Sequence, residues 1–334
     1  MSRRFVLILS GVLALFTVSL IWQFAETDVQ LAAEKVWGFV TGKPINQTSS
    51  KDLSGLPMQR YSDGKKYYNP LFISRDAKEA FFLRNDPKMQ KRFIQYTDWL
   101  LQHAVETDST LDIYYEFDYP KYGQKEPWQS ALAQASLMNA LLQRAGYERD
   151  LDIYTKAYKA LNSLRPELGK VAVALNDSSY WYMEYPAEEP YFSLSGMITT
   201  LLELNYYYKK TEDPLALELF EKGYNSVIYL IPLYDFGGGY TYYNLKGVKS
   251  GRMYHQKLVK RVEELNKLKP ANELRYYADR WTMADSYPVL WQLIRNPKPK
   301  RILLFSFTFI LLWTGYFLLL GGAHNKAKDA LAYS

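Results

Sequence analysis

The sequence contains no cysteine and only three histidines among its 334 residues. Without thiols the chain forms no disulfide, has no thiolate nucleophile and offers no cysteine ligand to a metal. The histidines, His103, His255 and His324, lie too far apart in the sequence to indicate a metal cluster. No acidic loop has the ligand spacing of a calcium site. We therefore expect no metal.

Signatures of nucleic-acid binding are also missing. The net charge is +6, but the basic residues are scattered along the chain. No Gly-rich phosphate loop, zinc-finger spacing or RNA-binding aromatic motif occurs. The charge balance therefore favours an acidic polymer or an anionic membrane surface as partner and argues against nucleic acid.

Aromatic residues are abundant, at 16% of the sequence with 30 tyrosines. Such an excess of amphipathic rings suggests grooves that stack on partly polar rings such as sugars. Most individual tyrosines are still expected to cover a helical core.

Two segments are long and apolar enough to cross a bilayer. Residues 5–25 and 302–323 carry no charge over about 20 positions. A cleaved signal peptide is the alternative for the first segment, but the run is long and no small-residue cleavage site follows it. Arg3 and Arg4 before the first span favour a cytoplasmic N-terminus and an extracytoplasmic central region. The basic residues between 295 and 301 favour the opposite orientation.

The region between the spans predicts a mainly α fold. After a linker (26–56), residues 57–126 predict a small β-rich or extended region, because their runs of Tyr, Phe and Ile contain Pro. Residues 127–295 predict antiparallel helix pairs, with helices at 127–146, 150–164, 193–208, 214–230, 254–268 and 272–292. We expect an incomplete (α/α) toroid with short β-hairpins, flanked by two transmembrane helices.

Three connections carry polar groups suited to proton transfer. They are "LNDSSYWYMEYPAEEPYFSLSGM" (175–197), "LYDFGGGYTYYNLKG" (233–247) and "GRMYHQKL" (251–258). Together they supply several phenols, the Glu184 carboxylate, the His255 imidazole and the cations Lys246 and Arg252. Such a set suits removal of a proton next to a carboxylate and its return on the other face.

The order of these blocks resembles the C-terminal catalytic domain of D-glucuronyl C5-epimerases. The resemblance covers about residues 117–268, through "FDYPKYGQKEPWQSALAQASLMNALLQRA", "YWYMEYPAEEPYFSLSGM", "YDFGGGYTYYNL" and "MYHQKL". It implies an isomerase that converts glucuronate to iduronate in heparan-type glycosaminoglycans by C5 proton exchange, without a cofactor. It also implies that Glu184 and Tyr185 are the proton-transferring pair on opposite faces of the sugar, assisted by Tyr243 and Tyr254. The same family often forms dimers, so a homodimer is a further expectation.

The expected substrate contacts come from the same loops and from the first helix of the domain. They are His255, Lys246, Arg252, Tyr180, Tyr182, Trp128 and Gln134.

The chain departs from the family pattern at four positions, where Met183, Ser195, Asn244 and Leu258 replace an acidic residue, Asn, Asp and His. Two other functions therefore stay open. A polysaccharide lyase also begins by removing the C5 proton. A polysaccharide-binding subunit of a membrane synthase keeps the aromatic groove without turnover.

Overall fold

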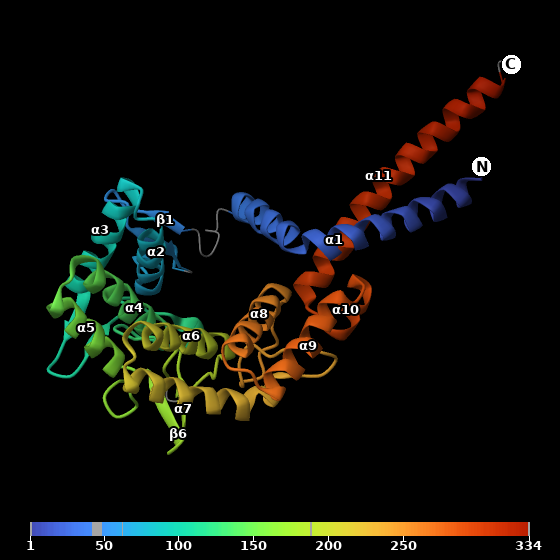
Figure 1. The fold of residues 1–334 in the computed structure, drawn as a ribbon. Coiled ribbons are helices and arrows are strands. Elements are labelled where there is room, and N and C mark those ends of the chain that lie inside the picture. Colours follow the sequence, from blue (N-terminus) through green and yellow to red (C-terminus); the bar gives the residue numbers. More distant parts are fainter. Residues whose placement is uncertain (1, 42–48, 62, 188, 333–334) are drawn as a thin grey trace. The chain divides into compact units, whose positions relative to one another are not determined.

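The computed structural model describes residues 2–41, 49–61, 63–187 and 189–332, and the chain forms two compact units (Figure 1). The central unit spans residues 46–282. The hairpin unit combines residues 1–45 with residues 283–334.

The central unit is built from paired helices. They are α2 (Pro70–Phe82), α3 (Pro87–His103), α4 (Ala131–Glu148), α5 (Leu151–Asn162), α6 (Leu194–Thr211), α7 (Pro214–Leu230), α8 (Arg252–Leu268) and α9 (Asn272–Ser286). Consecutive helices pack as α2 with α3, α4 with α5 and α6 with α7, while α2, α4, α6 and α8 contact one another in that order. One row of helices thus backs another, which is the layering of an incomplete (α/α) toroid and confirms the predicted fold class.

Short turns with strong capping residues join the helices of each pair. Arg149 and Glu212 end α4 and α6 in the left-handed conformation, each with φ 57°. Asp150 and Asp213 follow directly, and their side chains accept hydrogen bonds from backbone N–H groups in the first turn of α5 and α7. These two-residue turns return the chain along the helix that it has just formed.

Helix α4 lies at the centre of the core, because α2, α5 and α6 all pack against it. Its buried residues include many small ones, which let the neighbouring helices approach closely: Ala131, Ala133, Ala135, Ala140 and Ala145.

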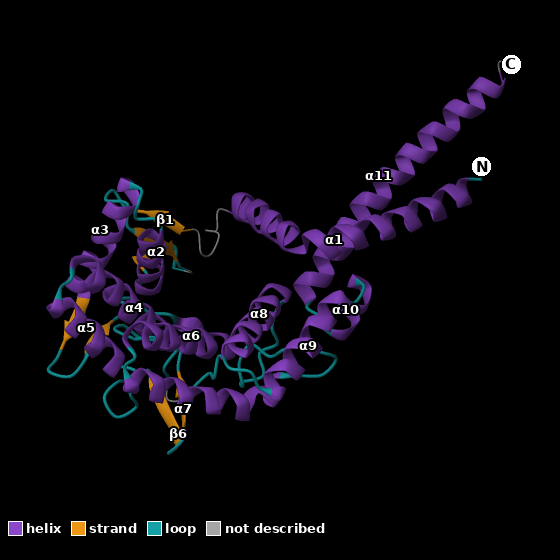
Figure 2. Cartoon of the chain, in the orientation of Figure 1, coloured by secondary structure: helices purple, strands orange, loops and turns teal. Residues whose placement is uncertain are grey.

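Strands are few and short among the described residues (Figure 2). The antiparallel sheets are β1 (Ser49–Lys51) with β2 (Pro57–Arg60) and β3 (Lys66–Tyr68), β4 (Ala104–Glu106) with β5 (Leu111–Ile113), and β6 (Ala172–Asn176) with β7 (Ser179–Tyr182). Two 3₁₀ turns are η1 (Pro120–Tyr122) and η2 (Ile231–Tyr234). The chain reverses at residues 237–239, since all three glycines have positive φ and Asp235 pairs with Thr241 beyond them.

The region 57–126 is more helical than the sequence interpretation expected, because it contains α2 and α3. Asn69 and Asp86 cap these helices through their side chains, and each is followed by a proline in the first turn. These capping signals determine the local structure, and they outweigh the aromatic runs that favoured strands. A second difference lies at Pro288, which separates α9 from α10 (Val289–Arg295) within the predicted helix 272–292.

The hairpin unit consists of α1 (Arg3–Thr41), α10 and α11 (Pro299–Ala332). Helices α1 and α11 pack side by side, and the N- and C-terminal ends of the chain lie at the same end of this pair (Figure 1). Segments Arg3–Glu26 and Pro299–Gly322 are long and apolar enough to cross a membrane.

The expected linker 26–56 differs from the structure in its first part, where α1 continues beyond a kink at Ala25 to Thr41. Residues 42–48 of that linker lie outside the described residues.

Candidate active site

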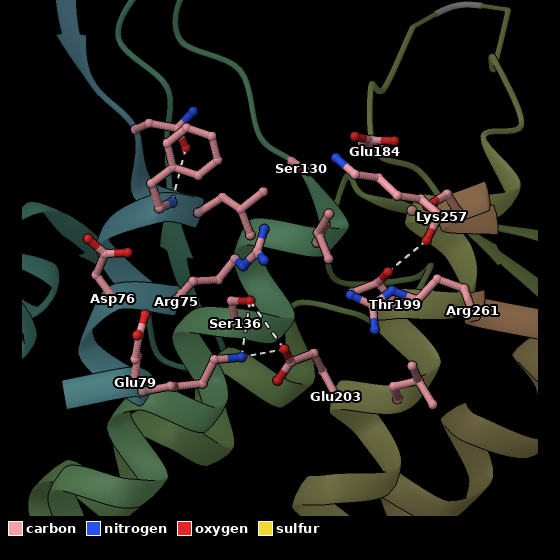
Figure 3. Close-up of a pocket in the computed structure, with 18 of the residues that line it drawn as sticks. Arg75, Asp76, Glu79, Ser130, Ser136, Glu184, Thr199, Glu203, Lys257 and Arg261 are labelled. Carbon is pink, nitrogen blue, oxygen red and sulfur yellow. Dashed lines mark hydrogen bonds and ion pairs between the residues drawn. The ribbon is translucent and has the colours of Figure 1, made fainter. Parts of the chain in front are cut away.

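A cavity of about 1030 Å³ opens among α2, α4, α6 and α8 of the central unit. Its wall includes Glu184, Tyr185 and Tyr254 from the predicted catalytic set, together with Trp128. Figure 3 shows Glu184 near one end of the cavity and Glu203 near the other, with Lys257 and Arg261 reaching in from α8.

Glu184 follows β7 and lies against the first turn of α6. The Ser193 hydroxyl donates a hydrogen bond of 2.6 Å to Glu184 Oε2. Ser193 is the N-cap residue of α6, yet its side chain makes no capping bond to the helix, because the hydroxyl is directed at the carboxylate. A Cβ atom at Gly196 would lie 2.8 Å from Glu184 Oε2 and 2.9 Å from Glu184 Cβ, so this approach needs a glycine.

Burial raises the pKa of the Glu184 carboxyl above its ordinary value. Hydrogen bonds from Ser193, Tyr185 and Tyr243 and the charge of Lys121 favour the ionised form and limit this rise in pKa. A carboxylate with a raised pKa is a stronger base than an exposed one and is suited to accept a proton from carbon.

The tyrosines beside Glu184 form a stacked group. The rings of Tyr185 and Tyr122 lie parallel with centroids 3.7 Å apart. The Tyr122 hydroxyl lies 3.4 Å from that of Tyr243, and the Tyr243 ring meets Tyr254 edge-on at 5.4 Å. Burial, reinforced by the charge of Glu184, raises the pKa of Tyr185 and of Tyr243, so both phenols are protonated and act as donors.

Tyr254 differs from the other two predicted catalytic tyrosines in the element that carries it, because it lines the cavity from helix α8. Burial raises the pKa of Tyr254, while the charge of Lys121 lowers it. Lys257 Nζ lies 5.8 Å from the centre of the Tyr254 ring. This phenol is therefore protonated at rest, and the charge of Lys121 favours its ionised form once it has given up its proton.

Lys121 was missed by the sequence interpretation. It is the cation that lowers the pKa of both Glu184 and Tyr254, and its Nζ lies 5.0 Å from the centre of the Tyr122 ring. The signal was present in "YPKYG", a cation between two tyrosines within one of the resembling blocks.

Three of the predicted substrate-binding side chains are buried in structural roles. His255 is 2% exposed, with Nδ1 3.0 Å from the Thr241 hydroxyl and Nε2 3.0 Å from the Trp281 carbonyl oxygen. The Tyr182 hydroxyl donates to the carbonyl oxygen of Leu219 at 2.7 Å.

The third of these side chains is Gln134, which bonds the backbone of β5 and α5 from inside the core. Direct contact of His255, Tyr182 or Gln134 with a substrate does not fit this burial. Polar side chains of this kind stabilise the walls of the site instead.

Three further predicted contacts do not line the cavity: Tyr180, Lys246 and Arg252. The Tyr180 hydroxyl accepts a hydrogen bond of 3.1 Å from Lys222. Lys246 lies 3.3 Å from the Glu189 carboxylate.

Trp128, the remaining predicted contact, does line the cavity. It stacks on Tyr115 with centroids 3.9 Å apart, and its indole N–H donates to the Phe117 carbonyl oxygen at 2.8 Å.

The four departures from the family pattern leave this geometry in place. Met183 and Leu258 are buried, and the Asn244 side-chain oxygen accepts hydrogen bonds from the backbone N–H groups of Lys246 and Val248. Ser195 is the departure that lines the cavity.

The layered helices and the hydrogen-bonded acid in the cavity wall define an (α/α) domain with a site suited to proton transfer. Residues 107–283, more than half of the chain, match the family model described as the D-glucuronyl C5-epimerase C-terminus. The chain belongs to this family, as the resemblance in its sequence predicted, and membership supports an epimerase-like role.

Two relatives are similar to the chain at the sequence level. An uncharacterized protein from Methanocaldococcus jannaschii is 27% identical over 231 residues, covering 62% of this chain and 75% of the relative. The D-glucuronyl C5-epimerase of Caenorhabditis elegans is 27% identical over 174 residues, covering 46% of this chain and 28% of that enzyme. The match thus spans less than a third of the worm protein.

Among solved structures, a GH76 α-mannanase from Bacteroides thetaiotaomicron aligns with a TM-score of 0.44 at 10% identity, covering 81% of this chain and 72% of the mannanase. A D-mannose isomerase aligns with a TM-score of 0.43 at 12% identity, covering 82% of this chain and 73% of the isomerase.

Proposed function

We propose that the protein is a uronosyl C5-epimerase that converts D-glucuronate to L-iduronate residues in an acidic polysaccharide. The observation that carries this proposal is Glu184, a carboxyl with a raised pKa in the cavity wall, with tyrosine donors around it. The adjacent phenols and cations suit the charge that develops when a carbon next to a carboxylate loses its proton.

The geometry favours Glu184 and Tyr254 as the two groups that transfer protons. Glu184 and Tyr185 are consecutive residues of one loop, and Tyr185 favours the ionised form of Glu184, so the two groups act from the same side of the cavity. Tyr254 lines the cavity from α8, away from the loop that carries Glu184 and Tyr185, and supplies a donor for the other face. Tyr185 and Tyr243 then position the Glu184 carboxylate, and this assignment replaces Tyr185 as the proton donor.

The reaction follows from these positions. The Glu184 carboxylate takes the proton as the C5–H bond breaks, and the electron pair moves into the sugar carboxylate. The Tyr254 hydroxyl then gives its proton to the opposite face of C5 and becomes a phenolate. Exchange with solvent returns a proton to Tyr254 and removes one from Glu184.

Hydrogen exchange in heavy water tests these roles. Wild-type protein with a glucuronate polymer is expected to give iduronate that carries deuterium at C5. Tyr254→Phe is expected to place deuterium in glucuronate without inverting it, because Glu184 still removes and returns the proton. Glu184→Gln is expected to do neither.

The same measurement contains the outcomes that contradict the proposal. Unsaturated uronic products that absorb in the ultraviolet would identify a lyase. Absence of deuterium with every glucuronate polymer would leave a binding subunit. Exchange without inversion in Tyr185→Phe, together with normal inversion in Tyr254→Phe, would restore Tyr185 as the donor.

We also propose that α1 and α11 cross a membrane as a hairpin, with the central unit on the extracytoplasmic side. The Thr17 and Tyr316 hydroxyls lie 3.0 Å apart, and Trp313 Nε1 donates to Ser10 Oγ at 3.1 Å, which are specific contacts between the two apolar helices. Lys300, one of the basic residues that favoured the opposite orientation, is paired with Glu34 at 2.6 Å.

Single cysteines test this orientation, because the chain has none of its own. A cysteine at exposed Ser178 is expected to react with a membrane-impermeant maleimide in intact cells, whereas one at Ser2 is expected to react only after lysis. The reverse pattern would invert the proposed topology.

A further inference from the structure

The cavity continues along α8 beyond Tyr254. Lys257, Lys260, Arg261 and Glu264 all line it, at the three- and four-residue spacing that puts side chains on one face of a helix. Since a helix rises 1.5 Å per residue, Arg261 lies about 10 Å along the axis from Tyr254. Lys257 is one turn from Tyr254, whereas Lys260 and Arg261 are too far along the helix to serve only the sugar ring at Glu184.

Two of these cations have no acidic partner. Arg261 is bonded to Glu264 at 2.5 Å. Within the described ranges, no carboxylate lies at ion-pair distance from Lys257 or Lys260, and both side chains are exposed. Two ammonium groups thus face the cavity with their charge uncompensated.

The rest of the wall differs in its charge. Lys78 of α2 is paired with Glu203, which also accepts a hydrogen bond from Asn139. Next to it on α2, Asp76 and Glu79 face the cavity with Arg75 (Figure 3). An anionic ligand is therefore attracted to the α8 side of the cavity and not to the α2 side.

We propose that Lys260 and Arg261 form a subsite for a second anionic group of the substrate, on a sugar unit next to the reacting one, while Lys257 stays beside Tyr254. This subsite rests on the proposed function, and it makes the substrate class a polymer with repeated negative charges. The shared chemistry is an anionic oxygen, supplied by the carboxylate of another uronate or by a sulfate ester. The Lys260 ammonium binds either one as a point charge without fixed geometry, and the Arg261 guanidinium can bind it in a bidentate way.

Binding by calorimetry on the full chain in detergent tests the subsite separately from catalysis. The probes are glucuronate alone, an unsulfated glucuronate-containing hexasaccharide and its sulfated counterpart. The variants are Lys260→Gln with Arg261→Gln in one chain, and Lys267→Gln as a control on the same helix that is exposed but does not line the cavity.

The double variant is expected to raise the Kd for a hexasaccharide about tenfold at low salt, which corresponds to about 1.4 kcal/mol. Its affinity is also expected to depend less on salt than that of wild type. Glucuronate alone is expected to bind both proteins equally, and Lys267→Gln is expected to match wild type.

The two probes separate the sources of the anion. A loss of affinity for the unsulfated hexasaccharide assigns the subsite to a carboxylate, and a loss restricted to the sulfated one assigns it to a sulfate ester. Equal affinity of the double variant and wild type for both probes overturns the subsite, as does failure of wild type to bind either. Binding that depends on Lys260 and Arg261, without deuterium exchange, would contradict the epimerase proposal alone.

Discussion

Among single residues, Ser193 is one that sets the protonation state of the Glu184 carboxyl. Its hydroxyl donates to Glu184 Oε2 at 2.6 Å, which favours the ionised carboxylate and lowers its pKa. Ser193→Ala removes this bond, so the pKa of Glu184 is expected to rise further. Because Glu184 acts as the base when ionised, the acidic limb of the kcat/KM profile is expected to move to higher pH. A pH series of the heavy-water exchange rate measures this shift.

The matched control is Ser193→Thr, which keeps a hydroxyl and is expected to keep the wild-type profile. Helix stability is expected to change little in Ser193→Ala, because the Ser193 side chain does not cap α6. Identical pH profiles for the alanine and threonine variants would contradict this role for Ser193.

Between helices, the packing of α7 against α6 depends on Gly223. A Cβ atom there would lie 2.5 Å from Leu201 Cδ2 and 2.7 Å from Tyr182 Cε2, and both side chains are buried. Gly223→Ala is expected to destabilise the central unit by about 1 to 3 kcal/mol through overpacking. A lower melting temperature in circular dichroism measures this effect.

Gly146→Ala is the control for helix propensity, because nothing lies within 4 Å of the added methyl group at that position in α4. This change is expected to be neutral or stabilising by up to about 1 kcal/mol. Equal melting temperatures for the two variants would show that α6 and α7 separate easily.

Helices were predictable where a cap and a periodic apolar face agree. Residues 214–230 were predicted to form a helix, and α7 (Pro214–Leu230) has those bounds, because Asp213 and Pro214 mark its start. Helix α2 was missed although Asn69 and Pro70 give the same signal, because the aromatic residues around them favoured a strand.

The candidate site was predictable only in part. Glu184, Tyr185 and Tyr254, which the family resemblance implied, all line the cavity. The burial of His255 and Gln134 depends on helices distant in sequence and is not visible in local patterns. Lys121 reaches the site through the 3₁₀ turn η1, and no periodicity in the sequence indicates that approach.

In the molecule as a whole, the hairpin unit is held together by a buried ion pair between α1 and α11. Arg301 of α11 contacts Glu26 of α1 at 2.6 Å, with side chains 7% and 3% exposed, and Gln292 accepts a further hydrogen bond from Arg301 at 3.0 Å. Glu26→Leu alone leaves a buried unpaired charge, so the hairpin is expected to lose about 3 to 5 kcal/mol. Resistance to proteolysis in detergent measures this loss.

The compensating control is Glu26→Leu combined with Arg301→Met, which removes both charges and is expected to recover most of the resistance. If the single variant is as resistant as wild type, the pair contributes nothing to holding α1 against α11.

The packing of α1 on α11 joins segments that flank the central unit in sequence. While the two helices stay together, an unfolded central unit remains a closed loop of roughly 240 residues and has fewer conformations than a free chain. In the chain-entropy model of cross-links, a closure of that size stabilises the folded state by up to about 5 kcal/mol. The two apolar helices thereby act on the central unit as a noncovalent counterpart of the disulfide that this cysteine-free chain lacks.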